Sequence, residues 1–284
     1  MNAPLTTSPG KESQMNSNPI ATVAPKLVGV LLGLAAIQGW ASERGFEHDP
    51  QRSESRIPAA FQVPTISASE AAAEMSALAL PSVDQLIALP FAGSYRKTAK
   101  TQMVSTGKIE EFKTVAALVQ NLRDTQPEQR VRAEYSKAHN GADLGGTNDA
   151  PRIKPYETHR VAITGYIRAI KWEAAGDNDF HVMVCDSAIP NDGVCFTVEV
   201  SGVPPSASAA VKKAFTLVRK QLLDITGVLG FADRFVRPDT PPRVRVEGAI
   251  FLDGKHSAGV VGPTDAKSPT AYEIHPVNRI ELAP

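Results

Sequence analysis

The sequence predicts a mixed α+β protein, mainly β, whose C-terminal half closes into a five-stranded barrel. Two observations carry this prediction. Five segments after Glu157 alternate between apolar and polar residues, as half-buried strands do. A stretch with apolar residues at helical spacing lies between the third and the fourth of them, and short runs of Gly, Asp and Asn mark the turns.

The first three strands follow one another directly. His159–Trp172 alternates around Gly165, and a glycine inside a long strand predicts a bulge or a sharp bend. The second strand begins at Phe180 after a turn-forming run, and alternate residues from Phe180 to Val184 share one face. The third follows another such run and turns alternate residues from Val194 to Val200 inward.

A helix and two further strands complete the barrel. Val211, Phe215, Val218 and Leu222 form one apolar stripe, which predicts a helix after the proline-rich break at 204–208. The last two strands cover 244–252 and 272–282. The order of three strands, a helix and two strands is that of an OB-fold, so we define residues 157–284 as an OB-fold domain.

The first 41 residues have the features of a signal peptide. Lys26 precedes the short uncharged apolar run Leu27–Ile37, and Ala41 ends a small-residue motif for cleavage. The run is shorter than the ~20 residues of a membrane-spanning helix, so we expect no stable membrane anchor after cleavage. We therefore predict an exported protein, periplasmic or secreted. Met1 and Met15 are both candidate starts, and a short buried helix is the alternative interpretation of the run.

Two segments lie between the signal peptide and the barrel. Residues 42–90 are rich in Ala, Ser and Pro, which is typical of a flexible segment. Residues 91–156 form an accessory region of helix and loop. Within it, apolar residues from Ile109 to Val119 fall at helical spacing and predict an amphipathic helix over 107–123.

The chain contains only two cysteines, Cys185 and Cys195. They fall on neighbouring strands of the predicted barrel, both on the side away from its core. An isolated pair in an exported protein favours a disulfide, with two free thiols as the alternative. An all-thiolate zinc site is excluded because it needs four cysteines.

Polar residues gather in two loops that an OB-fold brings together. Ligands of this fold usually lie near the loop between strands one and two and the loop between strands four and five. Here the first loop reads GDNDFH from Gly176, and the second runs from strand four into strand five. The candidate ligand-binding residues are Asp177, Asp179, His181, Asp253, His256, Glu273 and His275.

This cluster has three open interpretations. The aspartates and histidines could form a polar network that fixes the two loops. They could bind a divalent metal through imidazole and carboxylate groups, although neither H-x-x-x-H nor H-x-H spacing occurs. They could also be general acid–base groups of a hydrolase, with His181, His256 and His275 as the catalytic candidates. No cofactor other than a divalent metal is indicated.

From Asn148 onward the chain resembles a group of uncharacterised exported bacterial proteins with an OB-like C-terminal domain. The shared motifs are short but occur in the same order. They are NDAPR from Asn148, VAITGY from Val161, GDNDFH from Gly176, Asp253 with His256, and EIHPV from Glu273. The resemblance implies the fold and export, and it implies no activity.

We predict a non-enzymatic binding module that contacts a small ligand or a protein partner through the two loops. The alternative is a metal-assisted phosphodiesterase or nuclease that uses the Asp and His residues of the same loops. The 30 basic and 30 acidic residues of the chain balance. Because a barrel that tracks phosphates should be basic, we do not expect nucleic acid as a partner.

Overall fold

The computed structural model describes residues 65–67, 81–146, 149–227, 231–232 and 234–284. The chain divides into two compact units, 1–56 and 57–284, and all described residues belong to the second. The predicted signal peptide and most of the predicted flexible segment 42–90 therefore lie outside the described residues. Among the helices that the structure describes, none combines the length and apolar character needed to cross a membrane.

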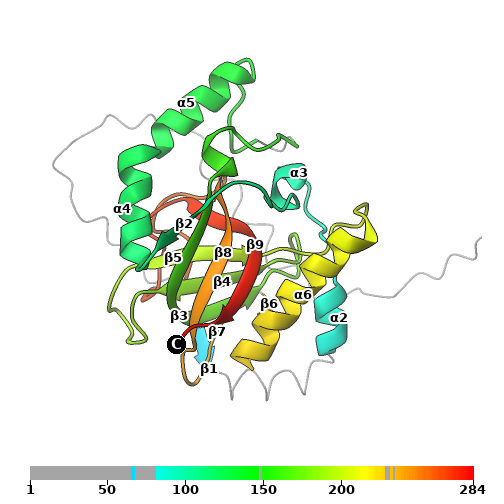
Figure 1. Ribbon diagram of the computed structural model, residues 1–284, viewed down its shortest axis with the longest axis vertical. Helices are drawn as coiled ribbons and strands as arrows, with labels where there is room; N and C mark the ends of the chain where they lie inside the picture. The colour runs from blue at the N-terminus through cyan, green and yellow to red at the C-terminus, as the bar shows by residue number, and fades with distance from the viewer. Residues whose placement is uncertain (1–64, 68–80, 147–148, 228–230, 233) are drawn as a thin grey trace, which may run out of the picture. The chain divides into compact units, whose positions relative to one another are not determined.

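Five strands form a closed barrel at the centre of this unit (Figure 1). Strands β3, β4 and β5 pair antiparallel in sequence order, β5 pairs parallel with β9, and β9 pairs antiparallel with β8. Strand β8 then pairs with β3 and closes the ring. The predicted five-stranded barrel is confirmed. Its strands are β3 (Arg160–Trp172), β4 (Phe180–Cys185), β5 (Cys195–Val200), β8 (Arg243–Leu252) and β9 (Tyr272–Leu282).

Helix α6 (Ala209–Thr226) connects β5 to β8. It begins where the Ser208 side chain accepts a hydrogen bond from the backbone N–H of Val211, and it ends at Gly227, which has a positive φ of 55°. Phe215, Val218 and Leu222 of this helix are buried in agreement with the predicted stripe. Val211 is 38% exposed instead, because it lines a cavity beside the first turns of the helix.

The irregularity of the first barrel strand lies further along the chain than predicted. Gly165 pairs regularly with Val244, and the pairing of β3 with β4 shifts between Ile167 and Ala169 instead. The shift turns Ala169 to the outer face and returns Ile170 to the main core. Gly165 has a packing role: a Cβ there would lie only 2.7 Å from the carbonyl oxygen of Cys185.

The helix predicted over 107–123 is wrong in its first half. Strand β2 (Ile109–Phe112) pairs parallel with the start of β3, because the edge of β3 is available there. Helix α4 (Val115–Thr125) begins only after Thr114, whose side chain accepts a hydrogen bond from the N–H of Ala117. Apolar spacing alone could not separate the strand from the helix that follows it.

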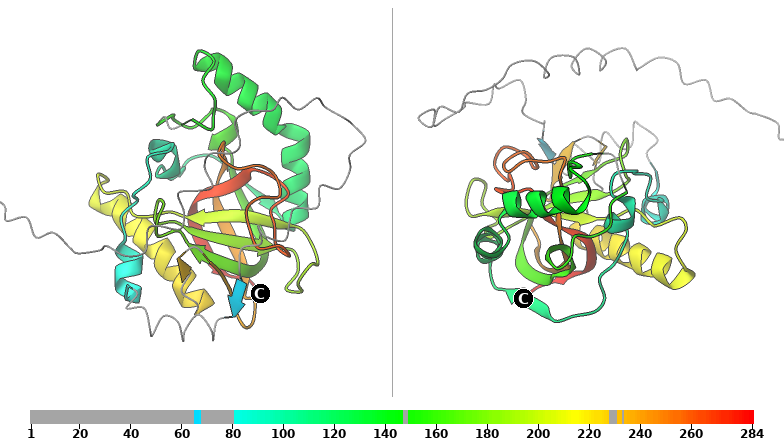
Figure 2. Two further views of the ribbon diagram at one scale, coloured as in Figure 1. Left: turned by 180° about the vertical axis from the view of Figure 1, so that it is seen from behind. Right: turned by 90° about the horizontal axis from the view of Figure 1, so that it is seen from above.

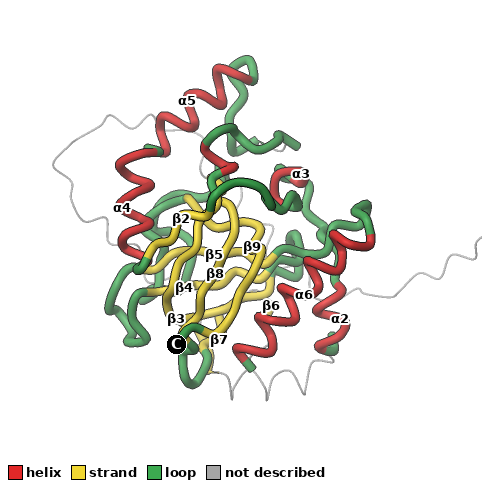
Figure 3. Tube along the Cα trace, viewed as in Figure 1, coloured by secondary structure: helices red, strands yellow, loops and turns green. Residues whose placement is uncertain are grey.

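Short helices and strands outside the barrel surround it on several sides (Figures 2 and 3). The last residues of the predicted flexible segment form α2, which has a capping box at Ser82 and packs beside α6. These additional elements are α2 (Val83–Ala88), α3 (Lys97–Lys100), α5 (Glu128–Ala138), the 3₁₀ helix η2 (Tyr156–Thr158), β1 (Thr65–Ser67), β6 (Phe231–Ala232) and β7 (Phe235–Arg237).

Cys185 and Cys195 form the predicted disulfide. The two residues are directly paired across β4 and β5. Both belong to a small apolar cluster on the outer face of the barrel, together with Met183, Phe235 and Ala266. The disulfide therefore links two strands beneath the long loop between β8 and β9.

Asp265 fixes that loop to the barrel. Its carboxylate accepts hydrogen bonds from Arg168 of β3 at 2.7 Å and from both terminal nitrogens of Arg237 of β7. Burial by itself would raise the pKa of the Asp265 carboxyl, but Arg237 and Arg168 outweigh burial and hold this pKa below its ordinary value. The ionised form of Asp265 thus stabilises the folded state.

We expect Asp265→Asn to lower the free energy of unfolding by about 1–3 kcal/mol at pH 7, because two arginines lose a charged acceptor. The folded-state pKa of this carboxyl is lowered, so its contribution is complete above the unfolded-state pKa of about 3.9 and is lost as pH falls below it. Urea titrations at pH 7 and pH 3 should show a smaller difference in the free energy of unfolding between Asp265→Asn and the unaltered chain at pH 3.

The matched control is Asp224→Asn, which removes an exposed i,i+4 pair with Lys220 on α6. We expect its cost to stay below about 0.5 kcal/mol at either pH. Equal costs for the two variants would contradict the anchoring role of Asp265.

Candidate functional site

The predicted polar residues meet on the outer face of the barrel. Alternate residues of β4 and β5 point into the core, so His181 and Glu199 point outward, directly opposite each other in the register. Strand β9 continues this face, because Glu273 pairs with Thr197 and the next outward residue is His275. Each of the four titratable side chains, His181, Glu199, Glu273 and His275, is at least 97% buried despite facing away from the core.

The segment that leads into α3 covers this face and buries it. Arg96, fully buried, makes two hydrogen bonds to the carboxylate of Glu157 at 2.8 and 2.5 Å. The same guanidinium donates to the carbonyl oxygens of Leu252 and Pro151 and lies 4.5 Å above the ring of Phe251. This arrangement ties the accessory region to the end of β8 and sets the position of the residues that follow Arg96.

One helical turn later, Lys100 enters the cluster of carboxylates. Its ammonium nitrogen lies 3.0 Å from Asp177 Oδ2, 3.6 Å from Glu199 Oε2 and 3.9 Å from Asp253 Oδ2. Burial would lower the pKa of Lys100, but Glu199 and Asp177 outweigh burial, so this pKa is raised. Lys100 is therefore a fixed positive charge, and its pKa excludes the role of a neutral nucleophile at neutral pH.

His275 lies at the bottom of the cluster and is fully buried. Its Nδ1 lies 2.7 Å from Glu199 and 3.0 Å from Glu273, and its Nε2 lies 2.6 Å from the hydroxyl of Ser201 and 3.3 Å from Asp179. Asp179 in turn accepts a hydrogen bond from the backbone N–H of Gly202. These four partners hold the imidazole ring in one orientation.

His181 and His256 both line a cavity and lie edge to face with each other. Their ring centroids are 6.5 Å apart, with the rings nearly perpendicular. His181 Nε2 lies 2.9 Å from Glu173 Oε2, and His256 Nδ1 lies 3.2 Å from Asp253 Oδ2. The cavity measures about 340 Å³, and its polar lining comprises Ser94, Tyr95, Lys100, Glu173, Asp177, His181, Lys255 and His256.

Four carboxyls of the cluster have opposing pKa shifts. The pKa of Glu173 falls to about 2, chiefly because His181 lies beside it. The pKa of Asp253 also falls to about 2, because His256 and Lys100 outweigh the effect of burial. Burial and neighbouring carboxylates raise the pKa values of Asp179 and Glu273. The lowered pKa values favour the ionised forms of Glu173 and Asp253, and the raised pKa values favour the protonated forms of Asp179 and Glu273.

The pKa values of His275 and His256 also shift in opposite directions. Burial lowers the pKa of His275, which keeps this ring neutral at neutral pH. For His256, burial acts in the same direction, but the adjacent Asp253 outweighs it and raises the pKa. The cluster thus separates a neutral histidine inside from a histidine that gains positive charge at the cavity.

The structure places all seven predicted residues in one cluster. Asp177, His181 and His256 line the cavity. Asp179, Asp253, Glu273 and His275 are buried behind it and contact the cavity-lining side chains or one another. The sequence pattern located the cluster, and only the tertiary structure separates residues that reach the cavity from residues that support it.

Four residues of the cluster were missed. Lys100, Tyr95 and Glu173 have no motif around them, and the first two come from a region without a clear pattern. Glu199 could have been found, because it is the one charged residue of the apolar strand CFTVEV and alternates with the inward-facing valines. The predicted pairing of the second and third strands would then have placed it beside His181.

Three groups of side chains in the cluster have the composition of a metal site. Within each group the ligand atoms lie within 4.8 Å of one another. Imidazole nitrogen and carboxylate oxygen together suit divalent transition metals. The groups are Glu173 with Asp177 and His181, Asp179 with Glu199 and His275, and Asp253 with His256 and Glu273.

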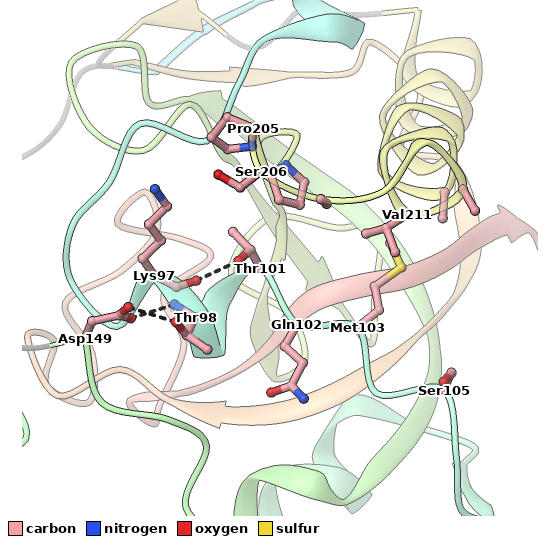
Figure 4. A pocket seen from close by; sticks show the side chains of 14 residues that line it. Lys97, Thr98, Thr101, Gln102, Met103, Ser105, Asp149, Pro205, Ser206 and Val211 are labelled. Atoms are coloured by element: carbon pink, nitrogen blue, oxygen red, sulfur yellow. Dashed lines mark hydrogen bonds between the residues drawn. The ribbon is translucent and has the colours of Figure 1, made fainter. Parts of the chain in front are cut away.

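A second, larger cavity of about 800 Å³ lies between α3 and the first turns of α6 (Figure 4). Its lining is mostly apolar or hydroxylated and includes Met103, Pro205 and Val211. Its charged residues are Lys97 and Asp149, and Asp149 already accepts hydrogen bonds from the N–H and hydroxyl of Thr98. This cavity therefore lacks the convergent charged groups of the first, although it is larger.

Comparison with protein-family models, with curated proteins and with solved structures found no match to this chain.

We expect His275→Ala to lower the free energy of unfolding by about 1–3 kcal/mol, because Glu199 and Asp179 would keep their burial and lose a partner. His256→Ala should cost less than about 1 kcal/mol, because its side chain is 31% exposed and contacts one carboxylate. Urea unfolding followed by circular dichroism measures both. Equal losses would contradict the division into supporting and cavity-lining histidines.

Proposed function

We propose that this chain is an exported binding module that holds a small polar ligand in the 340 Å³ cavity beside β4 and β5. One observation carries the proposal: both predicted loops and the α3 segment contribute charged side chains to the same cavity. Buried charges are costly unless they are paired or serve a ligand. A concave site with a few converging polar groups is the usual form of a small-molecule site.

The size and lining of the cavity narrow the class of ligand. A volume of about 340 Å³ is at the lower end of the range for ligand pockets, which begins near ~300 Å³. Lys100, Lys255, Glu173 and Asp177 bring both signs of charge to the lining. We therefore expect a small polar ligand rather than an extended strand of nucleic acid or a protein segment.

A metal-assisted phosphodiesterase remains the second candidate, and one observation favours it. Two histidines line the cavity edge to face with each other, and each lies beside its own carboxylate, which provides candidates for a general acid and a general base. Hydrolysis of a phosphodiester such as bis(4-nitrophenyl) phosphate, lost in His181→Ala and His256→Ala, would favour this candidate over a binding module.

Export rests on the sequence features around Lys26–Ala41 and agrees with the disulfide between Cys185 and Cys195. We expect expression of the full chain in a bacterial host with a periplasm to yield a mature protein that begins at Ser42. Intact mass and N-terminal sequencing of the periplasmic fraction would show this. Recovery of the uncleaved chain from the cytoplasm alone would contradict export.

A fragment-binding experiment tests the proposed cavity. Ser94 is exposed and lines it, so Ser94→Trp would fill the entrance with little effect on the fold. We expect polar fragments detected by ligand-observed NMR to bind the unaltered chain and to lose at least tenfold in affinity in Ser94→Trp.

Ser206→Trp is the matched control, because Ser206 lines the second cavity instead. Fragments that keep their affinity in Ser94→Trp and lose it in Ser206→Trp would move the binding site to α6 and overturn the proposal.

A further inference from the structure

We propose that Glu173, Asp177 and His181 bind one divalent transition-metal ion at the entrance of the cavity. This inference rests on the proposed function and names the ligand class for the same site. The three side chains line the cavity, and their ligand atoms lie within 4.8 Å of one another. All three come from the same hairpin: Glu173 follows β3, Asp177 is in the turn, and His181 is in β4.

The hairpin holds the three residues in place before any ion arrives. Lys171 pairs with His181 and Trp172 with Phe180, so the last residues of β3 and the first of β4 are in register. The N–H groups of Glu173 and Asn178 bond to the carbonyl oxygens of Asp179 and Glu173 and close the turn. A site on such a rigid element needs little ordering when it binds a metal.

Buried polar atoms without hydrogen bonds point to a missing ligand. His181 is only 3% exposed, yet its Nε2 makes no hydrogen bond, although Glu173 Oε2 lies 2.9 Å and Glu199 Oε1 lies 3.3 Å away. Asp177 Oδ1 and Glu199 Oε1 are also buried without a hydrogen-bond partner. Two ligand atoms bound about 2.1 Å from one ion at a tetrahedral angle lie about 3.4 Å apart, so the 2.9 Å between His181 Nε2 and Glu173 Oε2 would widen slightly around an ion.

The lysines nearby leave one oxygen of each carboxylate available. Lys100 lies 3.0 Å from Asp177 Oδ2, whereas Oδ1 of Asp177 has no hydrogen-bond partner. Lys171 lies 3.8 Å from Glu173 Oε1, and Oε2 faces His181. A cation can therefore approach the free oxygen atoms without displacing either ammonium group.

The other two groups fit a metal less well. Asp179, Glu199 and His275 are fully buried, and Ser201 and Gly202 already bond to His275 and Asp179. In the third group Asp253 binds the N–H of Lys255 and lies beside Lys100. The Glu173 group alone of the three has all its members on the cavity.

The donor atoms set the class of ion. One imidazole nitrogen and two carboxylate oxygens suit Zn²⁺ or Mn²⁺ better than Ca²⁺ or Mg²⁺, which prefer oxygen ligands alone. Water would complete the coordination from the cavity side, where the ion meets solvent. The site is thus expected to distinguish Zn²⁺ from Mg²⁺ at equal concentration.

Isothermal titration of the full chain, purified without a histidine tag and stripped with chelator, tests the inference. We expect one Zn²⁺ per chain, no comparable binding of Mg²⁺, and a Kd for Zn²⁺ at least tenfold weaker in Glu173→Gln. Glu173 is about one-third exposed, so this variant should fold normally. Asp177→Asn and His181→Ala should weaken Zn²⁺ binding in the same way.

A second His–Glu pair provides matched controls. Glu110 lies 2.8 Å from His159, and the side chains of this pair, 47% and 27% exposed, are more accessible than those of Glu173 and His181, 32% and 4% exposed. Glu110→Gln and His159→Ala should leave the Kd for Zn²⁺ unchanged within twofold. Zn²⁺ binding that is absent, or that survives Glu173→Gln and Asp177→Asn, would overturn the metal site. Fragments that still bind in a Ser94-dependent manner would then keep the proposed function, whereas loss of both would overturn both.

Discussion

The buried ion pair of Arg96 with Glu157 is the constraint on which the candidate site depends. It joins the accessory region to the barrel through two hydrogen bonds at 2.8 and 2.5 Å, and Leu252 and Pro151 accept further bonds from the same guanidinium. Because both charges are fully buried, loss of either partner would leave the other uncompensated. The pair therefore fixes the chain just before Lys100 and closes the outer face of the barrel.

The positive charge of Lys100 reduces the repulsion between the carboxylates on that face. Asp177, Glu199 and Asp253 all lie within 4 Å of its ammonium group. A single ammonium cannot neutralise every carboxylate of the cluster, and burial together with neighbouring carboxylates raises the pKa values of the deep groups Asp179 and Glu273, which favours their protonated forms. The lowered pKa values favour negative charge on Glu173, which lines the cavity, and on Asp253, which is buried behind it.

The cavity combines rigid and anchored elements. On one side it has the β3–β4 hairpin, whose strands are in register up to Trp172 and Phe180. On the other side it has the β8–β9 loop, which Asp265 ties to Arg168 and Arg237. The disulfide of Cys185 and Cys195 joins β4 to β5 on the same outer face. Such support positions side chains before a ligand binds, which is what a selective binding site requires.

The sequence by itself determined the five barrel strands and the helix between them, and it located the polar cluster. A period of two fixes which residues face the core, so Phe180–Cys185 and Tyr272–Leu282 could be assigned without knowledge of their neighbours. Strand β2 was missed because its pairing partner lies about fifty residues away, and local spacing carries no information about such contacts. Lys100 and Arg96 were not predicted for the same reason. Lys100 pairs with Asp177 and Glu199, and Arg96 pairs with Glu157, and only the folded chain brings these partners together. Local pattern therefore decided the barrel, and long-range contact decided which charges meet at its surface.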